Sequence, residues 1–129
     1  IIIPEGITHI GNGAFAHCYK LEEVVLPSTL KVINDEAFAW CRSLEQITLP
    51  NKLETIGVSA FNYIGFKGYF VIPQSVTKIG ENAFEHMEDS VILCVFHTDK
   101  PAGWNKRWNG YENPSFKMLI SKLLNLQTS

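Results

Sequence analysis

Apolar residues return along this chain at one fixed interval of 23 residues. Phenylalanine occupies four equivalent positions, each directly after an alanine: Phe15, Phe38, Phe61 and Phe84. An isoleucine column and a proline column keep the same spacing, at Ile10, Ile33, Ile56 and Ile79 and at Pro4, Pro27, Pro50 and Pro73. Self-similarity at such a period indicates a repeat architecture. The pattern therefore predicts a solenoid whose stacked repeats share one core, with the phenylalanines as its spine.

Each repeat contains a short segment in which apolar and polar residues alternate. In residues 21–26 this alternation directs Val24 and Leu26 inward and Glu23 and Val25 outward on a sheet. Proline follows directly and ends the predicted strand, because it has no N–H to donate. The equivalent segments are residues 44–49, 67–72 and 90–95, of which the last two keep the pattern less completely.

The rest of each repeat is predicted to hold a second extended piece and a turn. The extended piece carries pairs such as Leu30 and Ile33. The next position, which suits a turn with positive φ, holds Gly or Asn: Gly11, Asn34, Gly57 and Gly80. The Ala-Phe pair follows, with an apolar residue three positions after Phe: Cys18, Cys41, Ile64 and Met87. This spacing predicts a short helical turn that faces inward.

The motif Ile-Gly-x-x-Ala-Phe-x-x-Cys-x-x-Leu, followed by an apolar strand ending in Pro, resembles the BspA-type (Treponema pallidum-type) leucine-rich repeats. Residues 12–18 and 35–41 carry it best, and the resemblance covers about residues 1–110. Segment 21–26 also fits the strand signature L-x-x-L-x-L of leucine-rich repeats. The resemblance implies an α/β repeat fold: a right-handed leucine-rich-repeat solenoid with short parallel strands on the concave face and turns or short helical turns on the other side.

The same resemblance carries expectations about function. Members of this family are mostly bacterial surface or secreted proteins, associated with adhesion and host-protein binding, and they bring no catalytic residues to carry over. We therefore expect a non-catalytic, adhesin-like interaction module that binds a protein or a glycan. The alternative is a structural spacer, in which the repeats present another domain.

Two different regions follow from the pattern: the repeats with a closing segment in residues 1–110, and a tail in residues 111–129. We expect Trp104 and Trp108 to lie over the open end of the core, in preference to forming an aromatic platform for carbohydrate. Residues 113–127 show apolar residues at helical spacing and predict an amphipathic helix, which could serve as a cap, an oligomerisation helix or a membrane-surface segment.

The first residues align with the middle of a repeat. The chain is therefore expected to continue upstream, or to have this edge covered by a second copy, because a bare terminal repeat exposes an apolar edge. Self-association through the N-terminal end stays open on this reasoning. No signal peptide is recognisable here, so a location at the cell surface or in the secreted fraction follows from the resemblance alone.

Charge and cysteine content narrow the function further. Lys and Arg number 11 against 13 Asp and Glu, which gives no basic field for nucleic acid. No apolar run reaches the ~20 residues that span a bilayer. Three cysteines without a CxxC pair favour neither a disulfide framework nor structural zinc. Cys18 and Cys41 are expected to be buried free thiols, although equivalent positions in adjacent repeats also lie near disulfide distance.

No catalytic or metal-binding set is predicted. Cys94 and His97 form the one close Cys/His pair, but alternation places them on opposite faces and no third group orients them. A metal bridging His17 and His86 is excluded, because three repeats separate them by about 15 Å. No cofactor is expected either, since the glycines form no phosphate-binding loop.

The candidate ligand face consists of the outward residues of successive strands. One column holds Glu23, Gln46, Tyr69 and Ile92, and its neighbour holds Val25, Thr48, Val71 and Cys94. This face runs from acidic to apolar along the solenoid. The apolar strip around Tyr69, Val71 and Ile92 fits a protein contact, while an ordinary exposed sheet face rich in β-forming residues explains the same pattern.

Overall fold

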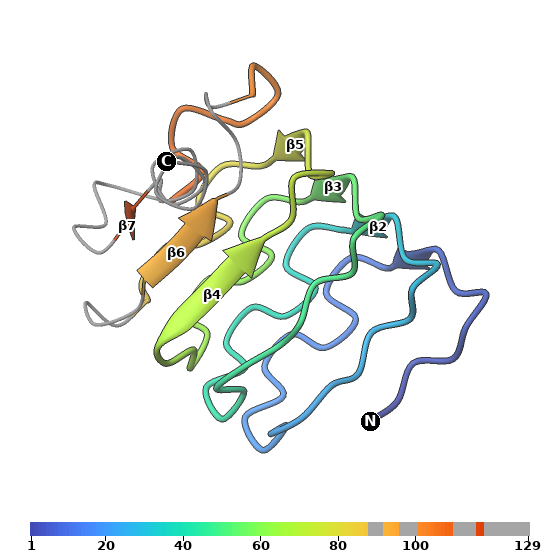
Figure 1. The fold of residues 1–129 in the computed structure, drawn as a ribbon. Helices are drawn as coiled ribbons and strands as arrows, with labels where there is room; N and C mark the ends of the chain where they lie inside the picture. Colours follow the sequence, from blue (N-terminus) through green and yellow to red (C-terminus); the bar gives the residue numbers. More distant parts are fainter. Residues whose placement is uncertain (88–91, 96–100, 110–115, 118–129) are drawn as a thin grey trace, which may run out of the picture.

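The computed structural model describes residues 1–87, 92–95, 101–109 and 116–117 of the 129-residue chain. The repeats stack side by side along the molecule, with the N-terminus at one end and the closing segment towards the other (Figure 1). All pairings between the described strands are parallel, and these strands form two sheets. The first sheet has the order β1 (His9–Ile10), β2 (Val32–Ile33), β3 (Thr55–Ile56), β5 (Lys78–Ile79). The second has the order β4 (Tyr69–Ile72), β6 (Ile92–Val95), β7 (Phe116–Lys117).

The first sheet is built from the second extended piece of each repeat. Its register pairs residues one repeat apart: Ile10 with Ile33, Ile33 with Ile56, and Ile56 with Ile79. All four isoleucines are buried. The 23-residue spacing thus holds in three dimensions, and the predicted parallel solenoid is confirmed.

The repeating phenylalanines form the spine of the core, as the sequence predicted. Ring centroids are separated by 5.2 Å between Phe15 and Phe38, 5.5 Å between Phe38 and Phe61, and 5.3 Å between Phe61 and Phe84. The last three rings are fully buried, and Phe15 is partly buried. Stacking at this distance occurs because one side chain is added per repeat, at about the 4.8 Å spacing between strands.

The turn that follows each Ala-Phe pair differs from the predicted short helical turn. Among the described residues no helix is present. Within a repeat, Ala14, Ala16 and Cys18 each donate the N–H group to the carbonyl three positions earlier, at Gly11, Gly13 and Phe15. The residues between them donate to the next repeat instead. Alternate N–H groups therefore join neighbouring repeats, and an α-helix would consume these groups within the turn.

Positive φ also falls elsewhere than predicted. One set of residues with positive φ lies two positions after the Gly/Asn column: Gly13, Glu36, Ser59 and Asn82. The other set lies two positions after each repeating Phe: His17, Trp40, Tyr63 and His86. The glycines of the predicted column have another role where repeats stack. A Cβ on Gly57 would overlap Asp35, and a Cβ on Gly80 would overlap the backbone of Val58. Close approach of neighbouring repeats, rather than a left-handed turn, accounts for them.

The closing segment continues the stack. Trp104 and Trp108 are 3% and 4% exposed, and the Trp104 Nε1–H donates to the Val76 carbonyl at 3.1 Å. Trp108 lies edge-on to Phe84, with ring centroids 5.9 Å apart. The two rings therefore cover the end of the core, as predicted, and their burial is incompatible with a carbohydrate platform.

The C-terminal tail is described at two residues only. Phe116–Lys117 form β7 and pair with β6 at Leu93 and Cys94. At these positions the structure has a strand where the sequence predicted an amphipathic helix over residues 113–127. A pairing partner in the folded chain overrides a local helical pattern. The rest of that helix prediction lies outside the described residues.

Candidate functional site on the sheet face

The predicted outward residues lie at the surface of the second-sheet side. Tyr69 and Val71 are 68% and 44% exposed, while the intervening Phe70 is buried. Val25 is 46% exposed beside the buried Val24. Glu23, Gln46 and Thr48 are exposed as well. Tyr69 pairs in register with Ile92, and Val71 with Cys94, so these residues share columns as predicted; the side chains of the last two lie outside the described residues.

Backbone pairing on this side is interrupted, and no sequence signal indicated this. At the N-terminal end the ladder is closed, because Val25 donates to the Ile1 carbonyl at 2.9 Å and accepts from the Ile3 N–H at 3.0 Å. It is closed again between β4 and β6. In the part of the chain that the structure describes, residues 46–49 make no backbone hydrogen bond to residues 24–26 or to residues 69–72.

The repeat register identifies the groups left bare. One repeat after Val25, Thr48 would donate to the Val24 carbonyl and accept from the Leu26 N–H. One repeat further, Val71 would donate to the Ile47 carbonyl and accept from the Leu49 N–H. Neither pair of bonds is formed among the described residues. Strand backbone groups without partners form a template for another chain.

Two grooves occupy the places of these missing bonds. The first groove, of about 1350 Å³, lies between residues 24–26 and 46–49. The second groove, of about 890 Å³, lies between residues 46–49 and 69–72 and is lined by Tyr69 and Val71. Ligand pockets in proteins commonly measure about 300–1,000 Å³. Both grooves are therefore large enough for a segment of a partner molecule.

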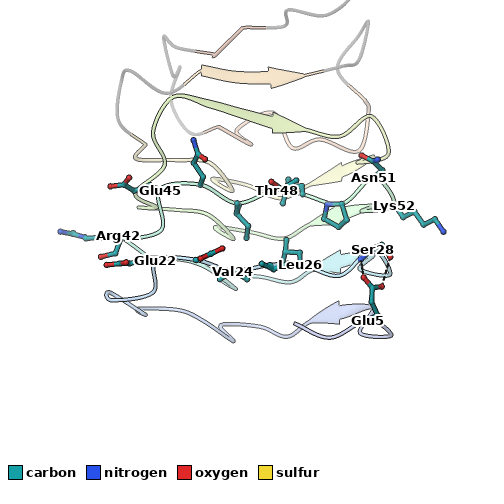
Figure 2. Close-up of a pocket in the computed structure, with 17 residues that line it drawn as sticks. Glu5, Glu22, Val24, Leu26, Ser28, Arg42, Glu45, Thr48, Asn51 and Lys52 are labelled. Atoms are coloured by element: carbon teal, nitrogen blue, oxygen red, sulfur yellow. Dashed lines mark hydrogen bonds between the residues drawn. The ribbon is translucent and has the colours of Figure 1, made fainter. Parts of the chain in front are cut away.

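Charge is distributed unevenly along the first groove. Figure 2 shows Glu22, Glu45 and Arg42 at one end, and Glu5, Ser28 and Lys52 at the other. Glu45 pairs with Lys67 at 3.1 Å, and the guanidinium of Arg42 lies 4.8 Å from the centre of the Trp40 ring. Among the described residues, neither Glu22 nor Glu23 forms an ion pair. This end of the groove therefore presents two carboxylates that form no ion pair in the described part of the chain.

At the other end, Glu5 links the first two repeats. Its carboxylate accepts from the Ser28 N–H at 3.0 Å and from the Ser28 hydroxyl at 2.8 Å. These two hydrogen bonds from Ser28 hold the pKa of the Glu5 carboxyl below its usual value. Both carboxylate oxygens of Glu5 therefore already accept hydrogen bonds within the fold.

The side chains two positions after each repeating Phe stack on one another in an aromatic column on the turn side. Trp40 and Tyr63 stack at 3.9 Å, Tyr63 and His86 at 4.1 Å, and His17 and Trp40 at 5.8 Å. The rings of neighbouring repeats thus cover one another's faces along this column. Among the described residues, no group of three His, Cys, Asp or Glu side chains is arranged to hold a metal.

The cysteines behave as packing residues where they are described. Cys18 and Cys41 are both free thiols, as predicted, but only Cys41 is fully buried, whereas Cys18 is partly buried. The Cys41 thiol donates to the Phe15 carbonyl at 3.1 Å. Burial raises the pKa of this thiol to about 11, which keeps it protonated. The Cys94 and His97 side chains lie outside the described residues. No helix among the described residues has the length and hydropathy needed to cross a membrane.

Comparison with known proteins shows which family the chain resembles. A family model for the BspA-type leucine-rich repeat region matches residues 1–91 in six copies. A leucine-rich repeat protein from Bacteroides ovatus is 37% identical, with a TM-score of 0.64 over 74% of this chain and 27% of its own. A leucine-rich repeat protein from Treponema pallidum is 33% identical, with a TM-score of 0.65 over 72% of this chain and 44% of its own. The chain thus spans less than half the length of either relative. No curated protein sequence matched it.

Proposed function

The chain belongs to the BspA-type leucine-rich repeat family, and we propose that it is an adhesin-like interaction module of a bacterial surface or secreted protein. Repeats of this family are generally non-catalytic and indicate a protein-interaction role, and the family is typical of bacterial surface proteins. The partner is a protein held on the face formed by Glu23, Val25, Gln46, Thr48, Tyr69, Val71 and Ile92.

The observation that carries this proposal is the exposed apolar pair Tyr69 and Val71 beside the second groove. Aromatic residues are enriched at protein interfaces, where they combine a large apolar area with a polar group. Apolar surface next to a concave, mostly apolar groove favours protein binding over solvation alone. The opposite expectation, an inert spacer, would leave this surface without a partner.

The test replaces both residues with lysine, as Tyr69→Lys with Val71→Lys. The chain and its variants are titrated by surface plasmon resonance against a panel of extracellular matrix proteins. The double variant is expected to lose binding, because two charges would be desolvated in the contact.

The control is Ile7→Lys with Val58→Lys, which alters two exposed apolar residues, 40% and 43% exposed, away from this face. The control should bind like the unmodified chain. Equal binding by both double variants would exclude this face, and absence of binding by the unmodified chain across the panel would favour the spacer.

A further inference from the structure

The bare backbone groups in the first groove have a geometry that a single extended peptide would satisfy. Val24 and Leu26 present one carbonyl and one N–H to the groove, and Thr48 presents an N–H and a carbonyl from the other wall. These four groups lack backbone partners among the described residues. Adjacent repeats normally satisfy such groups for each other, as Val25 does with Ile1 and Ile3.

We propose that the first groove binds an extended segment of a partner protein, which adds as a parallel strand between residues 24–26 and 46–49. This inference rests on the proposed function and names the form of its partner. Strand addition obtains affinity from main-chain hydrogen bonds and specificity from alternate side chains. The volume of about 1350 Å³ accommodates several residues of such a segment.

Three consecutive peptide residues complete the pairing. The central residue donates to the Val24 carbonyl and accepts from the Leu26 N–H, in the place that Thr48 would take. The residue before it accepts from the Thr48 N–H, and the residue after it donates to the Thr48 carbonyl. All four bare groups gain partners, which a side chain or a single hydroxyl could not achieve.

The side chains of the peptide follow from alternation. The central side chain points outward with Val25 and Thr48, while its two neighbours face the apolar floor formed by Val24, Leu26, Ile47 and Leu49. The residue two positions before the centre lies at the level of Glu23, near Glu22. Because these carboxylates form no ion pair among the described residues, a Lys or Arg is favoured there. The preferred segment is basic, apolar, any residue, apolar.

The experiment titrates the ¹⁵N-labelled full chain with the peptide Gly-Arg-Val-Thr-Val-Gly, acetylated and amidated. The amide protons of Leu26 and Thr48 are expected to move downfield, as they gain acceptors. The Val25 amide proton should move less than these two, because it already donates to the Ile1 carbonyl. A peptide with the alternation reversed, Gly-Arg-Thr-Val-Thr-Gly, should bind more weakly because it places polar side chains on the apolar floor.

Two further variants separate backbone pairing from side-chain contact. Methylation of the central threonine nitrogen of the peptide removes the donor to Val24 and should weaken binding about tenfold. In the protein, Thr48→Pro removes an N–H that is unpaired among the described residues, while Thr48→Val keeps it. The proline variant is expected to lose binding about tenfold relative to the valine variant. The methylated peptide provides the test even if the proline variant fails to fold.

Charge recognition is tested by Glu22→Gln with Glu23→Gln, which should weaken binding, against the exposed Glu36→Gln on the turn side, which should not. Equal binding by the methylated and unmethylated peptides would overturn the inference, as would shifts confined to Tyr69 and Val71. The double lysine variant of Tyr69 and Val71 should retain this peptide, since it alters the second groove. Failure of the inference and failure of the proposed function are thus distinguishable.

Discussion

The two sides of the solenoid differ in how completely neighbouring repeats are joined. On the turn side, Glu36, Phe38 and Trp40 each donate to the next repeat at 2.8 Å. On the second-sheet side, residues 46–49 share no backbone hydrogen bond with the segments beside them, among the residues that the structure describes. The same 23-residue period therefore accommodates one side with continuous backbone pairing between repeats, the closed side, and one where that pairing is interrupted, the open side. The closed side is expected to be the more rigid of the two, and the open side is the one on which we propose that a partner binds.

The largest effect is expected in the core that both sides share. Phe38→Ala should lower the free energy of unfolding by roughly 3–5 kcal/mol, because it opens a cavity in a fully buried ring stack. Chemical denaturation measures this change. Tyr19→Ala, at a residue that is 52% exposed, is the control and should change stability by less than about 1 kcal/mol. Equal losses of stability in the two variants would contradict the role of the stacked phenylalanines as the spine of the core.

Amide hydrogen exchange compares the two sides directly. The amides of Phe38 and Trp40 should exchange on the order of 100-fold more slowly than those of Leu26 and Thr48, because the former donate to the neighbouring repeat. Exchange measured residue by residue by NMR provides the readout. Protection of Leu26 and Thr48 in the free chain would mean that the ladder closes in solution, and it would remove the basis of the peptide site.

The close approach of repeats on the turn side is tested at glycine. A Cβ at Gly65 would overlap the Arg42 carbonyl oxygen, so Gly65→Ala should destabilise the chain by about 1–3 kcal/mol. Gly11→Ala is the matched control, since nothing lies within 4 Å of the added atom. That variant should be neutral or slightly stabilised, by up to about 1 kcal/mol. Thermal melts of the two variants measure the change in stability. An unchanged melting temperature for Gly65→Ala would contradict the close approach of neighbouring repeats at this glycine.

The smallest effect concerns the corner where Glu5 joins the second repeat. Because the folded pKa of Glu5 is lowered by Ser28, its contribution to stability is present above the unfolded pKa and is lost as the pH falls through the folded pKa. Ser28→Ala removes the hydroxyl donor but keeps the N–H, so the Glu5 pKa should rise part of the way. NMR titration of the carboxyl carbon measures it. Ser43→Ala, in the next repeat, should leave the Glu5 pKa unchanged.

Much of the fold could be predicted because burial follows side-chain type. The isoleucine and phenylalanine columns identified the core, and alternation identified Tyr69 and Val71 as outward residues. The turn was predicted less well. Phe15 and its equivalents donate to the next repeat, and local spacing cannot reveal a partner 22 residues away. The helix predicted around Phe116 failed at the two described residues for the same reason, since β6 pairs with them.

The sequence by itself determined that this chain is a leucine-rich repeat solenoid, which side chains form its spine, and that Trp104 and Trp108 close it. These features depend on the positions of apolar side chains, and the regular spacing of those side chains can be read directly from the sequence. Only the tertiary structure decided where neighbouring backbones pair and where Val24, Leu26 and Thr48 are left open. Every non-proline residue carries the same N–H and C=O groups, so pairing depends on the distance between repeats.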